Sequence, residues 1–253
     1  DYITTKEVVS VDDLVSELQV STLTAKNYLS RLVRRGRVKR IGRGLYQVSR
    51  EETVDVELNP EALNLLDLLK TRFPIADFVA WSLSMLADYS HYAIGRDLIF
   101  VEAAPVVSAS MRDFLLEKGY HAVLNPSKRD FQEYARYSEK FAFVLERKER
   151  YQVEGVLPTP ERIWLDLYYL ITRKELSFSA GELGIIFINM LRRGGVNFNC
   201  LLRYAQRRGL RDEVIVFLCN LRQAYPRLIP EEVFVGRKGA LKYIEEMVES
   251  IRE

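Results

Sequence analysis

Basic side chains are concentrated in one short stretch near the start of the sequence. The stretch from Lys26 to Arg43 contains eight Lys/Arg residues and no Asp or Glu. Residues 1–50 hold ten Lys/Arg against five Asp/Glu, whereas the remaining chain holds 27 against 30. A local excess of positive charge attracts phosphate backbones, although a solvated cationic face has the same composition. Nucleic-acid binding is therefore the first function to consider.

The order of residues within this stretch favours DNA binding over a solvated face. At 100° per residue, Ala25, Leu29, Leu32 and Val33 share one face of a helix, which we expect to pack on a preceding helix. The opposite face carries an amide, hydroxyls and arginines, which are the groups that read base edges in a major groove. We expect base contacts from Thr24, Asn27, Ser30 and Arg31, beside an exposed Leu23. We expect phosphate contacts from Arg34, Lys39, Arg40 and Arg43.

Local signals predict the elements that position these side chains. Ser10 is a suitable N-cap for a helix over 11–18, and Ser21 is one for a second helix that ends near Arg35, before Gly36. Two short alternating strands, 37–41 and 45–48, flank Gly42-Arg43-Gly44 and predict a β-hairpin. A helix, a tight turn, a basic helix and a basic hairpin, in this order, are typical of a winged helix-turn-helix.

Carboxylates and a lysine further along the chain form a candidate catalytic set. Asp97 and Glu102 flank the apolar segment 98–101 of a strand expected over 98–103, and Glu146-Arg147-Lys148 lies at the end of another strand over 141–146. Restriction-endonuclease-like folds hold Mg²⁺ with such groups on adjacent strands. A Glu-x-Lys triplet is frequent by chance, however, and this one lies in a run of charged residues. A metal-dependent nuclease is therefore the alternative function, and a winged-helix protein-interaction adaptor is a third.

Other reactive side chains are few, and they indicate structural roles. Asp166 lies in a nearly all-apolar helix, where a buried carboxylate needs a partner, so we expect a salt bridge to an arginine. Cys200 and Cys219 lack CxxC spacing and are expected to be reduced thiols, and His91 is expected to have a structural role. No P-loop, Gly-rich dinucleotide turn or HExxH motif occurs. We therefore expect a binding protein with no catalytic residues, metal site or cofactor.

A second basic stretch runs from Arg192 to Arg211, with six arginines and no acidic residue. Two of its arginine pairs precede glycines, which is also the pattern of ordinary helix C-termini. The alternative is a second surface for nucleic acid or an acidic partner. The arginines proposed for this second surface are Arg192, Arg193, Arg203, Arg207 and Arg208.

The full length of 253 residues predicts two domains. Residues 1–56 are expected to form the winged helix. Residues 57–253 are expected to form a mixed α/β domain with a mostly helical C-terminal part, divided near residue 157, because strands and helices alternate over 73–157 and helices dominate afterwards. The expected fold class is therefore α+β, with a linker over 51–59 and a last helix over 239–253.

Composition narrows the function classes further. Hydrophobic residues make up 48% and charged residues 28%, as in globular proteins. No apolar run is long enough to span a membrane, and Asp1-Tyr2-Ile3 does not begin a secretory signal, so a cytoplasmic location without membrane contact is expected.

Several segments resemble the AbiEi-like antitoxin family of type IV toxin–antitoxin (abortive infection) systems. Residues 29–46 are similar to the winged-helix segment of that family, and its C-terminal domain is similar to residues 80–82, 98–102, 124–127, 158–167 and 201–209. Residues 210–253 have no counterpart in this resemblance.

The resemblance implies a transcriptional repressor that binds double-stranded DNA at the promoter of its own operon. It also implies that the C-terminal domain counters a nucleotidyltransferase-type toxin. Palindromic promoters are usually read by two recognition helices, so either a homodimer or cooperative binding to repeated sites is also expected.

Overall fold

The computed structural model describes residues 8–34, 37–48, 58–91, 97–134, 140–148, 151, 153–154, 156–193 and 196–234. The chain has an α+β fold in which helices and three sheets form two compact units. Residues 1–53 and 190–253 make up the first unit, and residues 54–189 make up the second. The C-terminal helices therefore group with the N-terminal elements, whereas the sequence predicted one domain over 57–253. The expected helix over 239–253 and Gly36 lie outside the described residues.

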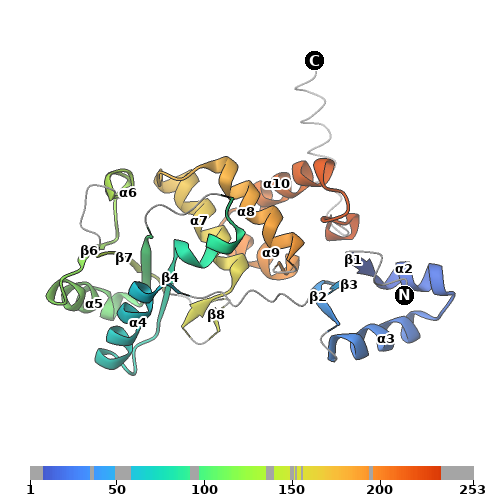
Figure 1. The fold of residues 1–253 in the computed structure, drawn as a ribbon, viewed down its shortest axis with the longest axis horizontal. Coiled ribbons are helices and arrows are strands. Elements are labelled where there is room, and N and C mark those ends of the chain that lie inside the picture. Colours follow the sequence, from blue (N-terminus) through green and yellow to red (C-terminus); the bar gives the residue numbers. More distant parts are fainter. Residues whose placement is uncertain are drawn as a thin grey trace, which may run out of the picture. The chain divides into compact units, whose positions relative to one another are not determined.

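The first unit begins with two helices and a small antiparallel sheet (Figure 1). Strand β1 (Val8–Ser10) precedes helices α2 (Val11–Leu18) and α3 (Thr22–Arg34), and strands β2 (Val38–Gly42) and β3 (Leu45–Val48) form the predicted hairpin. The strand order is β1-β3-β2. Strand β1 was not predicted from the sequence; it is only three residues long and pairs with β3 through Val8–Gln47 and Ser10–Leu45.

Side-chain caps determine where α2 and α3 begin. The Ser10 hydroxyl accepts a hydrogen bond from the Asp13 backbone N–H, and the Asp13 carboxylate accepts one from the Ser10 N–H, each at 2.9 Å. This reciprocal capping box satisfies two backbone donors that the helix itself leaves unpaired. The Ser21 hydroxyl accepts the Thr24 N–H at 3.1 Å, as expected of a cap for α3. Gln19, in a left-handed conformation, ends α2.

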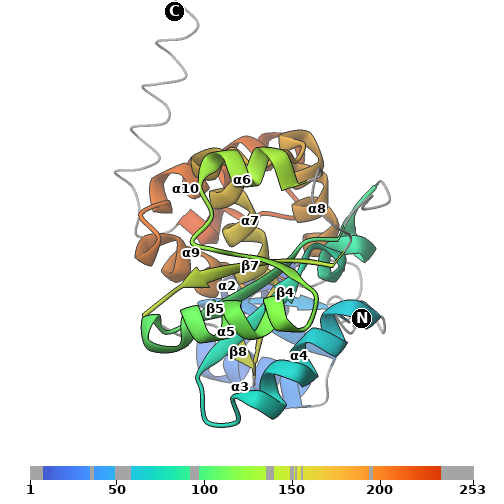
Figure 2. The ribbon, with the colours of Figure 1, turned by 90° about the vertical axis from the view of Figure 1, so that its left-hand side faces the viewer.

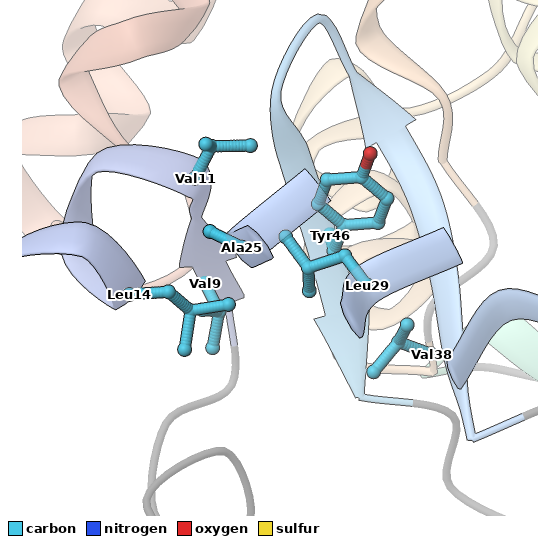
Figure 3. Close-up of a cluster of buried hydrophobic side chains, with 7 residues drawn as sticks. All are labelled: Val9, Val11, Leu14, Ala25, Leu29, Val38 and Tyr46. Carbon is cyan, nitrogen blue, oxygen red and sulfur yellow. The ribbon is translucent and has the colours of Figure 1, made fainter. Parts of the chain in front are cut away.

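A compact apolar cluster holds α2 and α3 on the sheet (Figure 3). Ala25 and Leu29 of α3 are buried, as the helical periodicity predicted, and Leu14 of α2 is buried beside them. The prediction for Val33 was wrong, because this side chain is 38% exposed near the end of α3. The other buried members of the cluster come from α2 and the sheet, and they are Val9, Val11, Val38 and Tyr46.

The C-terminal part of the first unit is helical. It contains the end of α8 (Ala180–Arg192), then α9 (Phe198–Arg207), α10 (Arg211–Ala224) and the short 3-10 helix η3 (Glu231–Phe234). Asn197 caps α9 by accepting the N–H groups of Asn199 and Cys200. Gly209 has a φ of 68°, the left-handed conformation expected of the glycine that separates α9 from α10.

The second unit is built on a four-stranded sheet with the order β4-β5-β7-β6. Strands β5 (Ile99–Ala103), β7 (Phe141–Glu146) and β6 (His121–Leu124) are parallel, and β4 (Phe78–Ser82) is an antiparallel edge strand. Helices α4 (Pro60–Arg72) and α5 (Pro105–Glu117) lie on one face of this sheet, and α7 (Pro160–Lys174) lies on the other (Figure 2).

Shorter elements complete the second unit. They are the 3-10 helix η1 (Leu83–Tyr89), helix α6 (Lys128–Glu133) and the two-stranded sheet of β8 (Val153–Glu154) and β9 (Leu157–Pro158). The strands expected over 98–103 and 141–146 are present as β5 and β7, and Asn59 caps the start of α4. None of the described helices combines the length and apolar character needed to cross a membrane.

Candidate nucleic-acid interface

One face of α3 presents polar and basic side chains to solvent. The predicted base-contacting residues Thr24, Asn27, Ser30 and Arg31 are all exposed, and Leu23 beside them is 69% exposed. Arg34 is exposed on the same helix. Within the described residues, neither Arg31 nor Arg34 has an acidic partner, so their guanidinium groups are not neutralised internally. The Thr24 hydroxyl is 2.9 Å from the Ser21 hydroxyl, which orients it at the start of the helix.

The hairpin presents a second set of basic side chains. Lys39 and Arg40 on β2 and Arg43 in the turn are exposed. Gly44 adopts a φ of 75°, which a side chain would strain, and its carbonyl accepts the Val11 N–H at 2.9 Å. This bond anchors the turn to the first residue of α2, so Arg43 lies on a turn that the fold holds in place.

A cavity of about 750 Å³ joins the start of α3 to the hairpin turn. Its basic lining residues are Lys26 of α3, Arg40 of β2 and Arg43 of the turn, and Phe198 and Asn199 of α9 also line it. The cavity has one acidic lining residue in the described part of the chain, Asp12. The predicted phosphate-contacting residues Arg40 and Arg43 therefore border the same concave surface.

The arginines of the second basic stretch have different surroundings. The Arg192 guanidinium carbon lies 5.8 Å from the centre of the Tyr225 ring, and Arg203 borders a separate cavity with Arg40 and Arg211. Arg193 and Arg207 are exposed and Arg208 is half-buried, close to the ends of α8 and α9. Of the five predicted arginines, Arg203 lines a cavity together with Arg40 of the hairpin.

Of the carboxylates proposed for a nuclease, Asp97 lies apart from the others, whereas Glu102 lines one small cavity with Arg147 and Lys148. Strands β5 and β7 are parallel, so Asp97 precedes β5 at one end of the sheet and Glu146 ends β7 at the other. Asp97 accepts the Ser84 N–H at 2.8 Å and the Asn59 side-chain amide. Glu146 accepts the Ser108 hydroxyl at 2.9 Å, and Lys148 is exposed. In the described part of the chain, no three His, Cys, Asp or Glu residues are placed to hold a metal ion.

Glu102 instead belongs to a buried charge network. Its carboxylate pairs with Arg162, lies 3.0 Å from Arg147 Nε and accepts the Trp81 indole N–H at 3.0 Å. Asp166 completes the network, with its carboxylate oxygens 3.1 Å from Arg147 Nη2 and 3.4 Å from Arg162 Nε. The arginine partner predicted for Asp166 is therefore present. The two negative carboxylates and the two positive guanidinium groups neutralise one another, and buried charges are stable only when they are paired in this way.

Desolvation raises the pKa of several titratable groups in the described part of the chain. Burial raises the pKa of the Asp97 carboxyl above its ordinary value, and hydrogen bonds from Ser84 offset part of this effect. Burial also raises the pKa of Tyr120 and of the Cys219 thiol. None of these groups belongs to the basic face of α3 or to the hairpin. Cys200 and Cys219 do not form a disulfide in the structure, as expected.

Comparison with known proteins identifies a family without identifying an activity. A family model described as a family of unknown function, DUF6577, matches residues 24–224. The match starts within α3 and ends at the last residue of α10, so it includes the basic hairpin and all of the second unit. A search of curated proteins found no match. Since the family model covers well over half of its length, the chain belongs to the DUF6577 family of unknown function.

Proposed function

We propose that residues 8–48 form a winged helix-turn-helix that binds double-stranded DNA. The observation that carries this proposal is the exposed face of α3, where Asn27, Ser30 and Arg31 stand beside Arg34 and no acidic side chain neutralises the arginines in the described residues. Amides, hydroxyls and guanidinium forks are the side-chain groups that recognise base edges. In this proposal α3 enters the major groove, and the hairpin turn with Arg43 contacts the neighbouring backbone or minor groove.

We propose that this binding takes place in the cytoplasm and represses the protein's own promoter. The support is the resemblance of residues 29–46 and of the C-terminal segments to AbiEi-like antitoxins. By the same resemblance, we propose that the remainder of the chain counters a nucleotidyltransferase-type toxin. Repression of a palindromic site would be achieved by a homodimer that places two α3 helices on successive major grooves.

Fluorescence anisotropy with the full-length protein tests the DNA-binding proposal. The probes are the duplex upstream of its own gene and a scrambled duplex of equal length and composition, each titrated over a salt series. We expect tighter binding to the upstream duplex and an affinity that falls steeply with salt, because bound arginines and lysines release counterions. Absence of salt-dependent binding to either duplex would contradict the proposal and would favour a protein-interaction role for the same elements.

Co-expression tests the antitoxin proposal separately. A nucleotidyltransferase gene adjacent to this one would be expressed alone and together with this chain, and growth would be followed. We expect this chain to restore growth. Continued growth arrest, with both proteins present in soluble form, would contradict the antitoxin role without affecting the DNA-binding proposal.

A further inference from the structure

A cavity of about 440 Å³ lies between β2 and α9 in the first unit, and we call it the α9 cavity. Three arginines line it, from three different elements: Arg40 of β2, Arg203 of α9 and Arg211 at the start of α10. Three amide side chains, those of Asn197, Asn199 and Gln206, also line it. Its lining is therefore dominated by hydrogen-bonding groups, and its charged groups are all positive in the described residues.

No acidic side chain among the described residues balances the positive charge of the α9 cavity. Arg40, Arg203 and Arg211 have no acidic partner within the described residues, in contrast to the buried network around Glu102. Arg203 is exposed and Arg211 is half-buried, so both guanidinium groups are reached by solvent. Three guanidinium groups around one concave surface repel one another, and an anion bound among them relieves this repulsion.

Hydrogen bonds orient the lining side chains before any ligand binds. Arg40 Nε donates to the Gly42 carbonyl at 3.1 Å, and Arg203 Nε donates to the Asn199 carbonyl at 3.3 Å. The Asn197 side chain caps α9 and also donates to the Arg40 carbonyl at 3.3 Å, which links the hairpin to the helix. Asn199, Arg203 and Gln206 are spaced four and three residues apart, so they lie on one face of α9. Orienting these groups in advance reduces the entropy lost on binding.

We propose that the α9 cavity binds a small molecule that carries one or more phosphate groups. Arginine forks match phosphate oxygens in a bidentate manner, and charge-assisted hydrogen bonds of this kind are among the strongest in proteins. A volume of about 440 Å³ lies within the range of small-molecule sites. No aromatic side chain lines the cavity in the described part of the chain, so the phosphate groups, rather than a stacked base, provide the recognition.

The cavity shares Arg40 with the surface that we propose contacts DNA. This consequence rests on the proposed DNA-binding function: a ligand that occupies Arg40 removes a phosphate contact and adds negative charge near the hairpin. Bound ligand therefore lowers the affinity for DNA. Arg203 and Arg211 lie outside α3 and the hairpin, so substitutions there separate ligand binding from base recognition.

Isothermal titration calorimetry of the full-length protein with inorganic pyrophosphate tests the cavity directly, without DNA. We expect saturable binding at a single site. Arg203→Gln and Arg211→Gln should each weaken it by about tenfold or more, because each removes a charge-assisted pair of hydrogen bonds. The matched control is Arg227→Gln, since Arg227 is exposed in the same unit and does not line the cavity; this change should leave binding within about twofold. Circular dichroism melting of each variant verifies its fold.

Two results would overturn the proposal. The first is a failure of specific pyrophosphate binding. Either binding is absent at millimolar concentration, or the control variant weakens it equally, which would show only general attraction to a basic protein. The second is loss of DNA affinity in Arg203→Gln and Arg211→Gln without any pyrophosphate binding, which would assign the cavity to a phosphate of the DNA backbone. Pyrophosphate binding that depends on Arg203 supports the cavity even if the protein binds no DNA, so the two proposals fail independently.

Discussion

Gln47 and Leu191 are joined by a hydrogen bond across 144 positions of the sequence, with the Gln47 side-chain amide 2.6 Å from the Leu191 carbonyl oxygen. Gln47 is buried on β3, the central strand of the small sheet, and Leu191 lies in the last turn of α8. The last four carbonyl groups of a helix have no partner within the helix, and a side chain from elsewhere can satisfy one of them. This bond ties the N-terminal sheet to the C-terminal helices of the first unit.

Replacing Gln47 with leucine removes this donor while keeping a side chain of similar size. We expect Gln47→Leu to lower the free energy of unfolding by roughly 1–3 kcal/mol, because the buried Leu191 carbonyl loses a hydrogen-bond donor. Urea unfolding followed by circular dichroism measures the change. Gln223→Leu is the matched control, since Gln223 is exposed on α10, and its effect should stay within about 0.5 kcal/mol. Equal effects of the two variants would show that the bond contributes nothing.

The buried charge network predicts a much larger loss. Arg162 is 1% exposed and pairs with both Glu102 and Asp166. Arg162→Met removes one of the two guanidinium groups that pair with these carboxylates, so we expect a loss of roughly 3–5 kcal/mol in the free energy of unfolding.

The control for Arg162→Met is Arg129→Met, which breaks an exposed pair with Glu133 on α6 and should cost less than about 1 kcal/mol. Urea unfolding again measures both variants. Wild-type stability in Arg162→Met would mean that Arg147 by itself compensates the two carboxylates.

Two arginines of the proposed DNA-binding elements should have different effects on specificity. Arg31→Ala removes a proposed base contact, and we expect it to weaken binding to the upstream duplex by about 1–3 kcal/mol with little effect on scrambled DNA. Arg43→Ala removes a proposed backbone contact and should weaken binding to both duplexes and reduce the salt slope by about one. Anisotropy titrations with both duplexes measure these changes. Equal losses on both duplexes for Arg31→Ala would contradict its assignment to a base.

The raised pKa of Asp97 predicts a stability that depends on pH in the acid range. A carboxyl group whose pKa is raised by folding holds its proton more tightly in the folded chain than in the unfolded chain. Its contribution to stability is fully present below the unfolded pKa and is lost as the pH rises through the folded pKa.

Unfolding of the wild-type protein and Asp97→Asn over a pH series measures this contribution. The wild type should lose stability relative to Asp97→Asn as the pH rises through the acid range, and the difference should then be constant at neutral pH. Asp97→Asn also removes the carboxylate oxygen that accepts the Asn59 amide. This loss changes the free energy of unfolding by the same amount at every pH, so it does not alter the pH dependence of the difference. The matched control is Asp212→Asn, because Asp212 is exposed in the first turn of α10. A difference between wild type and Asp97→Asn that is flat over the acid range would contradict the prediction.

The sequence alone determined most of the local structure. Ser10, Ser21 and the Asn59-Pro60 pair mark helix starts, and Gly209 marks a helix end, because caps act on backbone groups within a few residues. Apolar periodicity likewise predicted which side of α3 would be buried, apart from Val33 near its end. The opposite, polar face of α3 is the candidate interface, and it could be predicted for the same reason.

Only the tertiary structure decided which distant residues meet. Strand β1 forms because β3 supplies its hydrogen bonds, and a three-residue segment carries no periodicity of its own. An arginine partner for Asp166 could be expected from the sequence. That Asp166 and Glu102 share Arg147 and Arg162 depends on the packing of α7 against β5. The α9 cavity is the strongest case, since Arg40 and Arg203 are 163 positions apart. Local patterns encode backbone conformation, whereas charge partners and cavities depend on how the chain packs over long sequence distances.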